Sequence, residues 1–275
     1  MKSFLCVLTL VCLLLFGYVD ALFFLRSLPK EPRLSSTPMI VQELFHDPFV
    51  FFGSGSQCLV FASTTKPYLC KICKANRYQT IPYIDLFYQD FKKEERRMRD
   101  LRNYHTAYEE LSEETGILYL HFTETAWQHT HYNAALHIKL LFGLHITLPS
   151  DRLLFYIQKR ARPILSYLDD PTTTQANIHT FLCALFHSVQ KMCCKGFRIR
   201  DIYGKHMIKN LGEVDGKPLW MDPGRMVFTS KLKDPMHAHH LLCTFAEELS
   251  KALQETHPHI DVLSAFTETI KAESF

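Results

Sequence analysis

Two short segments decide the fold: residues 53–60, GSGSQCLV, and residues 68–73, YLCKIC. The first places Gly53 and Gly55 between two apolar runs that we expect to be strands. Glycines at such a turn let a hairpin backbone approach phosphate groups closely. A strand follows these glycines, whereas the dinucleotide-binding fingerprint opens a helix, so the segment does not match that fingerprint. A Gly-x-Gly sequence between strands is also typical of a simple flexible turn, and the glycines alone leave both interpretations open.

Lys71 lies inside the apolar run of residues 68–73. A lysine flanked by apolar residues on a strand must expose its ammonium group or pair it with a carboxylate. On an edge strand the side chain would face water, but beside the glycine hairpin it could face a bound phosphate. The glutamate-rich helix predicted after this strand offers four partners, among which we select Glu95; the others are Glu94, Glu109 and Glu110. Most other glutamates of that helix are expected to form a solvated face.

Carboxylate and amide side chains mark the second half of the chain. Asp201 ends the segment GFRIRD, and Asp222 follows a predicted strand and precedes Pro-Gly. A carboxylate in the position of Asp222 is well placed to hold Mg²⁺, and Asn210 upstream supplies a second oxygen ligand. A loop aspartate such as Asp201 could orient an attacking hydroxyl group. Taken alone, however, Asp-Pro-Gly is a turn sequence.

Apolar periodicity predicts strands on both sides of one long helix over residues 84–114. A second helix is expected over residues 174–194, and a helical tail from about residue 236. The predicted strands cover residues 42–52, 57–63, 68–73, 117–122, 134–141, 144–148 and 153–158, and a hairpin covers residues 211–214 and 218–221. This order predicts an α+β fold in two lobes rather than a doubly wound sheet.

The first residues predict that the chain is targeted to a membrane. Residues 4–19 are almost wholly apolar and follow Lys2, as in a secretory signal. Apolar character resumes at residues 22–25, so the stretch is also long enough to span a bilayer. Basic residues after it favour a cytoplasmic location of the downstream domain. We expect a membrane anchor over residues 1–28, with export after signal cleavage as the alternative.

Composition narrows the class of protein. Hydrophobic residues make up 47% of the 275 residues and charged residues 21%, which is ordinary for a globular protein. A net charge of +3, without a basic stripe, gives no support for nucleic-acid binding. The nine cysteines are an odd number and lie in apolar runs, which favours reduced thiols in the cytosol. Beyond residues 1–28, we expect a linker at residues 29–41, a first lobe at 42–158 and a second lobe at 159–275.

Several weaker signals favour ordinary structural roles. The Cys70-x-x-Cys73 pair lies in a strand, and not at the helix N-terminus that lowers thiol pKa values in redox motifs, so we expect two inert buried cysteines. The fifteen histidines show no set of three or four with ordered zinc-ligand spacing, and surface positions are expected for them. The chain has no Gly-x-Ser-x-Gly segment, so a hydrolase has no support.

In their order, these elements resemble the protein kinase-like superfamily, small-molecule phosphotransferases included. Gly53-x-Gly55-x-x-Cys58-x-Val60 is similar to the nucleotide-binding loop of that superfamily, and Lys71 to its phosphate-binding lysine. The pattern also resembles a group of uncharacterised kinase-like proteins from chlamydia-type intracellular bacteria. The resemblance implies a two-lobed fold with an antiparallel sheet and a long helix in the first lobe, and a reduced, mostly helical second lobe.

The second half of the chain continues the resemblance. Residues 196–201 are similar to the Gly-x-x-His-Arg-Asp catalytic segment, and residues 158–161 would be the hinge between lobes. Asp222-Pro-Gly resembles Asp-Phe-Gly, with Asn210 twelve positions earlier. The resemblance implies that Mg·ATP binds between the lobes and that phosphate passes to a small-molecule or lipid hydroxyl. The implied residues are Gly53, Gly55, Val60, Lys71 and Glu95 for ATP, Asn210 and Asp222 for Mg²⁺, and Asp201 for catalysis.

Departures from the pattern keep a second interpretation open. Cys58 replaces a glycine and Ile199 a histidine, and eight residues separate Asp201 from Asn210 where the family pattern has about four. Counted back from Asn210, the catalytic position falls on Lys205, which has no carboxylate. The alternatives are an inactive pseudokinase that recruits a protein partner to the membrane, or a structural membrane-anchored protein without a nucleotide site.

Overall fold

The computed structural model describes residues 48–55, 57–73, 91–122, 135–139, 145–149, 154–200, 202 and 205–273. The predicted anchor, the linker and Asp201 lie outside these residues. Among the residues that are described, no helix is both long and apolar enough to cross a membrane. Membrane attachment through residues 1–28 therefore stays a prediction of the sequence.

The chain divides into two compact units. The first comprises residues 1–99 and 119–158, and the second comprises residues 100–118 and 159–275. Residues 100–118 group with the second unit, although the sequence analysis placed them in the first lobe. Three apolar residues of this segment, Tyr104, Ala107 and Leu111, are spaced by three and four positions and are almost fully buried. This spacing is typical of the buried side of a helix.

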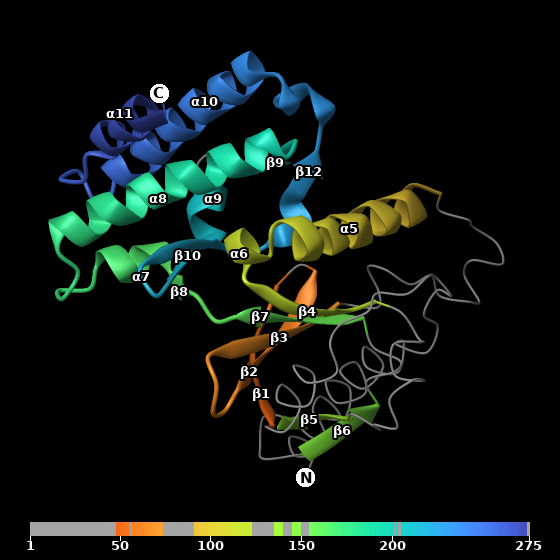
Figure 1. Cartoon of the computed structure of the whole chain (residues 1–275). Helices are drawn as coiled ribbons and strands as arrows, with labels where there is room; N and C mark the ends of the chain where they lie inside the picture. Colours follow the sequence, from red (N-terminus) through yellow and green to blue (C-terminus); the bar gives the residue numbers. More distant parts are fainter. Residues whose placement is uncertain are drawn as a thin grey trace, which may run out of the picture. The chain divides into compact units, whose positions relative to one another are not determined.

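The first unit is built on a sheet. Among the described residues, seven strands form it in the order β4-β7-β3-β2-β1-β5-β6 (Figure 1). Of the pairs with a described register, β1–β2, β2–β3 and β5–β6 are antiparallel and β1–β5 is parallel. The strands are β1 Phe49–Ser54, β2 Cys58–Ser63, β3 Tyr68–Cys73, β4 Ile117–His121, β5 Ala135–Lys139, β6 His145–Pro149 and β7 Phe155–Lys159. The predicted α+β class and the largely antiparallel N-terminal sheet are confirmed.

Aromatic side chains fill the core of this sheet. Phe61 and Phe155 are fully buried, and Tyr119 is 2% exposed. The buried His121 stacks on Phe155 with ring centroids 5.0 Å apart, and its Nδ1 is 3.0 Å from the hydroxyl oxygen of Tyr119. Because a buried polar group must find a hydrogen-bond partner, this contact explains how a histidine fits between aromatic rings in the core.

Among the described residues, the second unit contains most of the helices. They are α5 Phe91–Glu110, which begins in the first unit, α6 Ser112–Thr115, α7 Ile164–Leu168, α8 Gln175–Cys194, α9 Lys205–Lys209, α10 Pro235–Gln254 and α11 Val262–Glu273. Two small sheets accompany them: β8 Arg162–Pro163 with β10 Leu211–Val214 and β11 Lys217–Trp220, and β9 Phe197–Ile199 with β12 Met226–Phe228.

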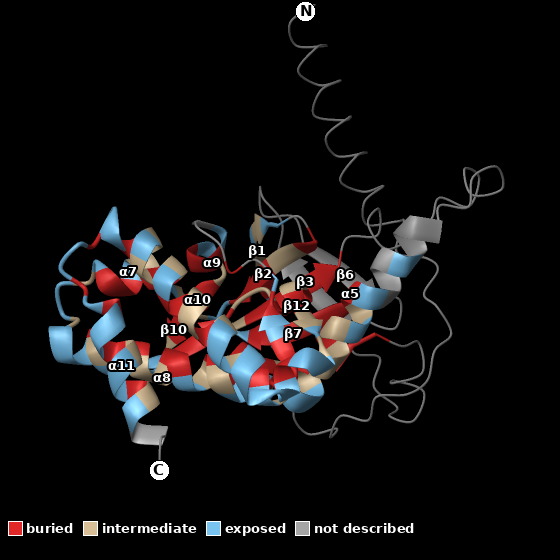
Figure 2. Ribbon diagram, turned by 90° about the horizontal axis from the view of Figure 1, so that it is seen from above, coloured by how far each residue is buried: buried red, intermediate tan, exposed pale blue. Residues whose placement is uncertain are grey.

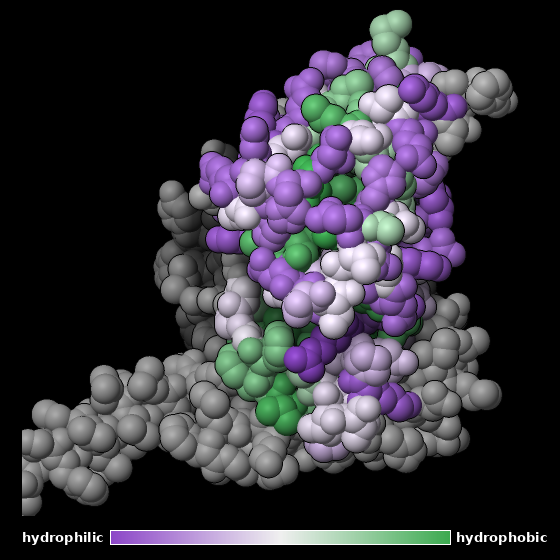
Figure 3. All heavy atoms as spheres, turned by 90° about the vertical axis from the view of Figure 1, so that its left-hand side faces the viewer, coloured by the Kyte–Doolittle hydropathy of each residue, from purple (hydrophilic) through white to green (hydrophobic). Residues whose placement is uncertain are grey.

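Helix α8 lies at the centre of the second unit. Its first turn is fixed by a capping box, in which the Thr174 hydroxyl accepts from the Asn177 amide and the Asn177 side chain accepts in return. One face of α8 is buried against α10, α11 and β11. Figure 2 shows exposed residues on the outer sides of these helices, and Figure 3 shows that the face near α7 and α11 is largely hydrophilic. Helix α8 therefore provides the apolar support for the rest of this unit.

Gly116 offers a test of this packing. It ends α6 with φ = 64°, and a Cβ added there would lie 2.3 Å from Cδ1 of Leu219. We expect Gly116→Ala to lower the free energy of unfolding by about 2–4 kcal/mol, because left-handed backbone strain and overpacking add. The measurement is urea unfolding followed by Trp220 fluorescence in a Trp127→Phe background.

Gly216 is the matched control. It has φ = 77°, but no atom lies within 4 Å of an added Cβ. Gly216→Ala should cost only the backbone strain, about 1–2 kcal/mol. Equal losses in the two variants would contradict a tight contact between Gly116 and Leu219.

Candidate functional site

The strand register of the first unit aligns three of the predicted site residues. Gly53 on β1 is the partner of Val60 on β2, and Val60 is the partner of Lys71 on β3. Directly opposed residues of antiparallel strands project from the same face of a sheet. Val60 and Lys71 therefore share a face, with the backbone of Gly53 at the end of the row. The β1 register shifts between Phe51 and Gly53, so an irregularity directly precedes the glycines.

Neither the backbone conformation nor the packing at Gly53 and Gly55 requires a glycine. The turn closes through a hydrogen bond from the Gly55 amide to the Cys58 carbonyl, 2.9 Å long. Neither Gly53 nor Gly55 has a positive φ. In the described structure, no atom lies within 4 Å of a Cβ built at Gly53, and a Cβ at Gly55 would make only an ordinary contact. The free space beside this backbone suits the close approach of a ligand.

Lys71 is buried, and not on an edge strand. Its side chain is 9% exposed, and β3 lies between β2 and β7. This excludes the alternative in which an edge-strand lysine faces water. The Nζ atom lies 5.7 Å from the ring centre of Tyr156, within cation–π range. A positive charge at this position suits an anionic ligand.

The cysteines around Lys71 are buried, as expected. Cys70 and Cys73 are three positions apart on a strand and so lie on opposite faces. Burial raises the pKa of the Cys70 thiol far above its usual range. Cys73 instead faces Cys58, with sulfur atoms 3.9 Å apart, and all three are free thiols. Cys58, where the kinase-like pattern has glycine, is therefore a small buried residue of the β2–β3 pair.

The second unit brings Asn210 and Asp222 to the same end of a hairpin. Strands β10 and β11 pair in antiparallel register, with Leu211 opposite Trp220. Just beyond this pair, the Met221 amide donates to the Asn210 carbonyl at 2.8 Å. Asn210 thus adjoins the residue before Asp222. Both side chains are partly exposed, and an oxygen of Asp222 is 3.9 Å from Nε of Arg225.

The donor set of this pair fits a hard cation. An amide oxygen and a carboxylate oxygen are ligands that Mg²⁺ accepts, with waters or phosphates completing its octahedron. The backbone around Asp222 is held in place, because a 3₁₀ turn follows at Pro223–Arg225 and the Asn103 side chain donates to the Gly224 carbonyl at 3.5 Å. Asn210 and Asp222 could therefore hold Mg²⁺.

No described contact links Glu95 or Asp201 to the other predicted site residues. Glu95 lies on α5 with an exposed side chain, and its pairing with Lys71 stays a prediction. Asp201 lies outside the described residues, although its neighbours are held: the Arg200 amide donates to the Arg225 carbonyl at 2.8 Å, and Ile202 is buried. Residues 205–209 form α9, so the long segment before Asn210 is partly helical.

Sequence reasoning missed one cluster with ligand chemistry. His179 and Cys183 on α8 lie beside Glu268 on α11. The available signal was the four-residue spacing of a histidine and a cysteine on a predicted helix, which puts both on one side.

An ion network supports the strand that follows Asn210. Nη1 of Arg162 is 2.5 Å from Asp170, and Nη2 is 3.1 Å from Glu213 on β10. The guanidinium also lies 4.8 Å from the ring centre of Tyr167. Because Arg162 pairs with Glu213 in the β8–β10 register as well, the network fixes β10 from its side opposite β11.

Comparison with known proteins gives no further guide: no family model matches the chain, and no curated protein matches it significantly. The functional interpretation therefore depends on the arrangement of its own residues.

The ion network of Arg162, Asp170 and Glu213 predicts that the free energy of unfolding depends on pH in the acid range. Hydrogen bonds from the Thr172 hydroxyl and amide, with the Arg162 pairing, lower the pKa of Asp170 below its ordinary 3.8. A carboxyl whose pKa is lower in the folded state stabilises the fold above the unfolded pKa, and this contribution is lost as pH falls through the folded pKa. Asp170→Asn should therefore reduce stability by a constant amount above about pH 5, and the difference should shrink toward zero in stronger acid.

Urea unfolding from neutral to acid pH measures this difference. Thr172→Ala should give a smaller loss over the same range, because Arg162 still pairs with Asp170. A difference between wild type and Asp170→Asn that persists unchanged in strong acid would show that charge plays no part.

Proposed function

We propose that the chain is a kinase-like protein that binds Mg·ATP. Gly53, Gly55 and Lys71 are the phosphate ligands in this proposal, and Asn210 and Asp222 hold the metal. Bound Mg·ATP would supply a phosphoryl group whose negative charge the metal and the lysine neutralise. The acceptor in this proposal is a hydroxyl group of a small molecule or lipid, which Asp201 orients.

The row Gly53–Val60–Lys71 is the observation that carries the proposal. A glycine with open space at its Cβ position, an apolar valine and a buried ammonium group are partners across three adjacent strands. Backbone amides of the hairpin can donate to phosphate oxygens, and Lys71 supplies the positive charge. The apolar Val60 suits contact with a flat base. This combination favours a nucleotide over an anion such as free carboxylate.

The Asn210–Met221 hydrogen bond supports the metal part of the proposal. It holds Asn210 next to the residue that precedes Asp222, at one end of the hairpin. Neither Asn210 nor Asp222 is buried. Half-exposed oxygen ligands suit Mg²⁺, which keeps several waters when it binds to protein.

Cys58 favours the second candidate function, an inactive pseudokinase that recruits a protein partner to the membrane. Its thiol packs against Cys73 within the sheet, where a third glycine would leave the hairpin backbone more accessible. Under this alternative the wild-type chain does not transfer phosphate. Asp201→Ala separates the two candidate functions. If the chain is a phosphotransferase, this variant should still bind ATP but no longer transfer phosphate.

The test of the proposal is a thermal-shift titration of the full chain with ATP, with and without Mg²⁺. A ligand that binds only the folded state raises its stability by about 2.7 kcal/mol at 100 times Kd. We expect a Mg²⁺-dependent shift that Lys71→Ala reduces or abolishes, and that Asp222→Ala makes independent of Mg²⁺.

Lys66→Ala is the matched control, since it removes the same charge from the turn that joins β2 and β3. It should keep the full shift. No shift at millimolar ATP, or an equal loss in the Lys66 and Lys71 variants, would reject the site.

A further inference from the structure

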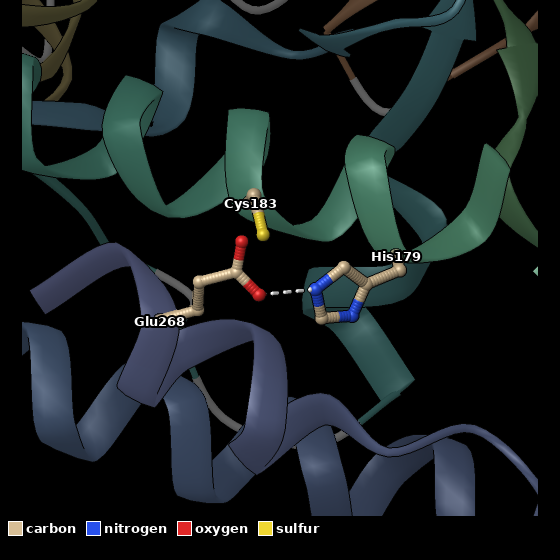
Figure 4. Close-up of side chains that lie close together, drawn as sticks. All are labelled: His179, Cys183 and Glu268. Atoms are coloured by element: carbon tan, nitrogen blue, oxygen red, sulfur yellow. Dashed lines mark hydrogen bonds and ion pairs between the residues drawn. The ribbon is translucent and has the colours of Figure 1, made fainter. Parts of the chain in front are cut away.

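Three side chains with metal-ligating atoms meet where α11 packs against α8. His179 and Cys183 are four residues apart on α8, and Glu268 lies on α11. Nε2 of His179 is 2.8 Å from a carboxylate oxygen of Glu268, and the ligand atoms of all three lie within 4.8 Å of one another. Figure 4 shows the thiol and the bonded ring nitrogen both directed toward the carboxylate.

We propose that His179, Cys183 and Glu268 form a zinc site that fastens α11 to α8. Imidazole, thiolate and carboxylate are the three ligand types that protein zinc sites use. The sulfur ligand favours Zn²⁺ over Mg²⁺ or Ca²⁺, which prefer oxygen ligands. Three protein ligands leave one tetrahedral position for water. In the part of the chain that the structure describes, no other group of three such residues comes as close.

The distances are compatible with this metal after small side-chain movements. Zinc bonds of about 2.0–2.3 Å at tetrahedral angles place ligand atoms roughly 3.4–3.6 Å apart. The 4.8 Å limit for these three atoms exceeds that separation by roughly 1 Å. The Glu268 side chain is 67% exposed and His179 is 39% exposed, so both can adjust their rotamers. Metal could also enter from solvent on this side.

Cys183 provides the fixed part of the site. It is half-buried, and its sulfur lies 3.7 Å from the Ala265 carbonyl, one turn before Thr269 on α11. The Thr269 hydroxyl donates to the same carbonyl at 2.9 Å. The thiol is thus held toward α11, while the two ligands nearer to solvent can close over a metal ion.

Nucleophilic catalysis is a poorer interpretation of the same cluster. Burial raises the pKa of the Cys183 thiol, and the nearby Glu268 carboxylate raises it further, although a hydrogen bond with Thr269 opposes this. A reactive cysteine needs a lowered thiol pKa. A bound Zn²⁺ would instead replace the thiol proton, which leaves to solvent, so the cluster suits a metal better than a covalent reaction.

The chain contains a matched control pair. His239 and Cys243 lie on α10 with the same four-residue spacing, and their Nε2 and Sγ atoms are 3.5 Å apart. This pair is not grouped with a third ligand among the described residues. It therefore shows how tightly a helical His-x-x-x-Cys pair binds metal without a third ligand.

The experiment is a titration of the reduced, full-length chain with Co²⁺, followed by competition with Zn²⁺. We expect one equivalent to bind with thiolate-to-cobalt charge-transfer absorption, and Zn²⁺ to displace it and raise the melting temperature. Cys183→Ser should abolish the charge-transfer band. Glu268→Gln, which keeps a hydrogen-bonding side chain at an exposed position, should weaken binding at least about 10-fold, the lower end of losses for outer-shell partners.

The double variant His239→Ala/Cys243→Ser should bind as wild type does. Melting of each variant without metal shows whether the fold is kept, and Glu268→Gln provides the test if Cys183→Ser does not fold. The proposal is overturned if no charge-transfer band forms, if Glu268→Gln binds as tightly as wild type, or if the control variant loses the site. None of these results depends on ATP binding, so the zinc site and the nucleotide proposal fail or succeed separately.

Discussion

Lys71 is buried on an interior strand of its sheet, and burial of a charged ammonium group costs several kcal/mol unless its charge is compensated. The aromatic ring of Tyr156 is one of the groups that contact this charge. The strand register then determines what lies beside the lysine: Val60 on the same face and the glycine hairpin at the end of the row. An anion bound there would gain from a positive charge that is already desolvated, and this relation connects the fold of the first unit to the proposed nucleotide.

The second unit positions oxygen ligands at the end of a short β-hairpin. Hairpin β10–β11 is only four residues long on each side, and it is held by the Arg162 network and by packing of Trp220 against Phe245. The Asn210–Met221 hydrogen bond extends this rigidity to the hairpin end. The same unit keeps the cluster of His179, Cys183 and Glu268 on its helical face. The two proposed metal sites thus use different parts of the same unit.

Much of the fold could be predicted because its periodicity is strong. β3 has the bounds that its apolar run predicted, and β10 has the bounds of the first arm of the predicted hairpin. The helix predicted from residue 174 is α8, which Thr174 caps. The short elements β9, β12, α7 and α9 were missed, because three to five residues are too few to show a period. The burial of Lys71 depends on strand order, which periodicity does not contain. The zinc cluster depends on the packing of α11 against α8, and the pairing of Glu95 depends on side-chain positions that no local pattern specifies.

The most direct measurement of the central claim is labelling of the full chain with an acyl-phosphate of ATP, which transfers its acyl group to a lysine amine beside the bound phosphates. Mass spectrometry then locates the modified residue. The account predicts modification of Lys71 that excess Mg·ATP prevents, with Lys66 unmodified as the internal reference. Modification spread over surface lysines, unaffected by Mg·ATP, would contradict a nucleotide site at the Gly53–Val60–Lys71 row.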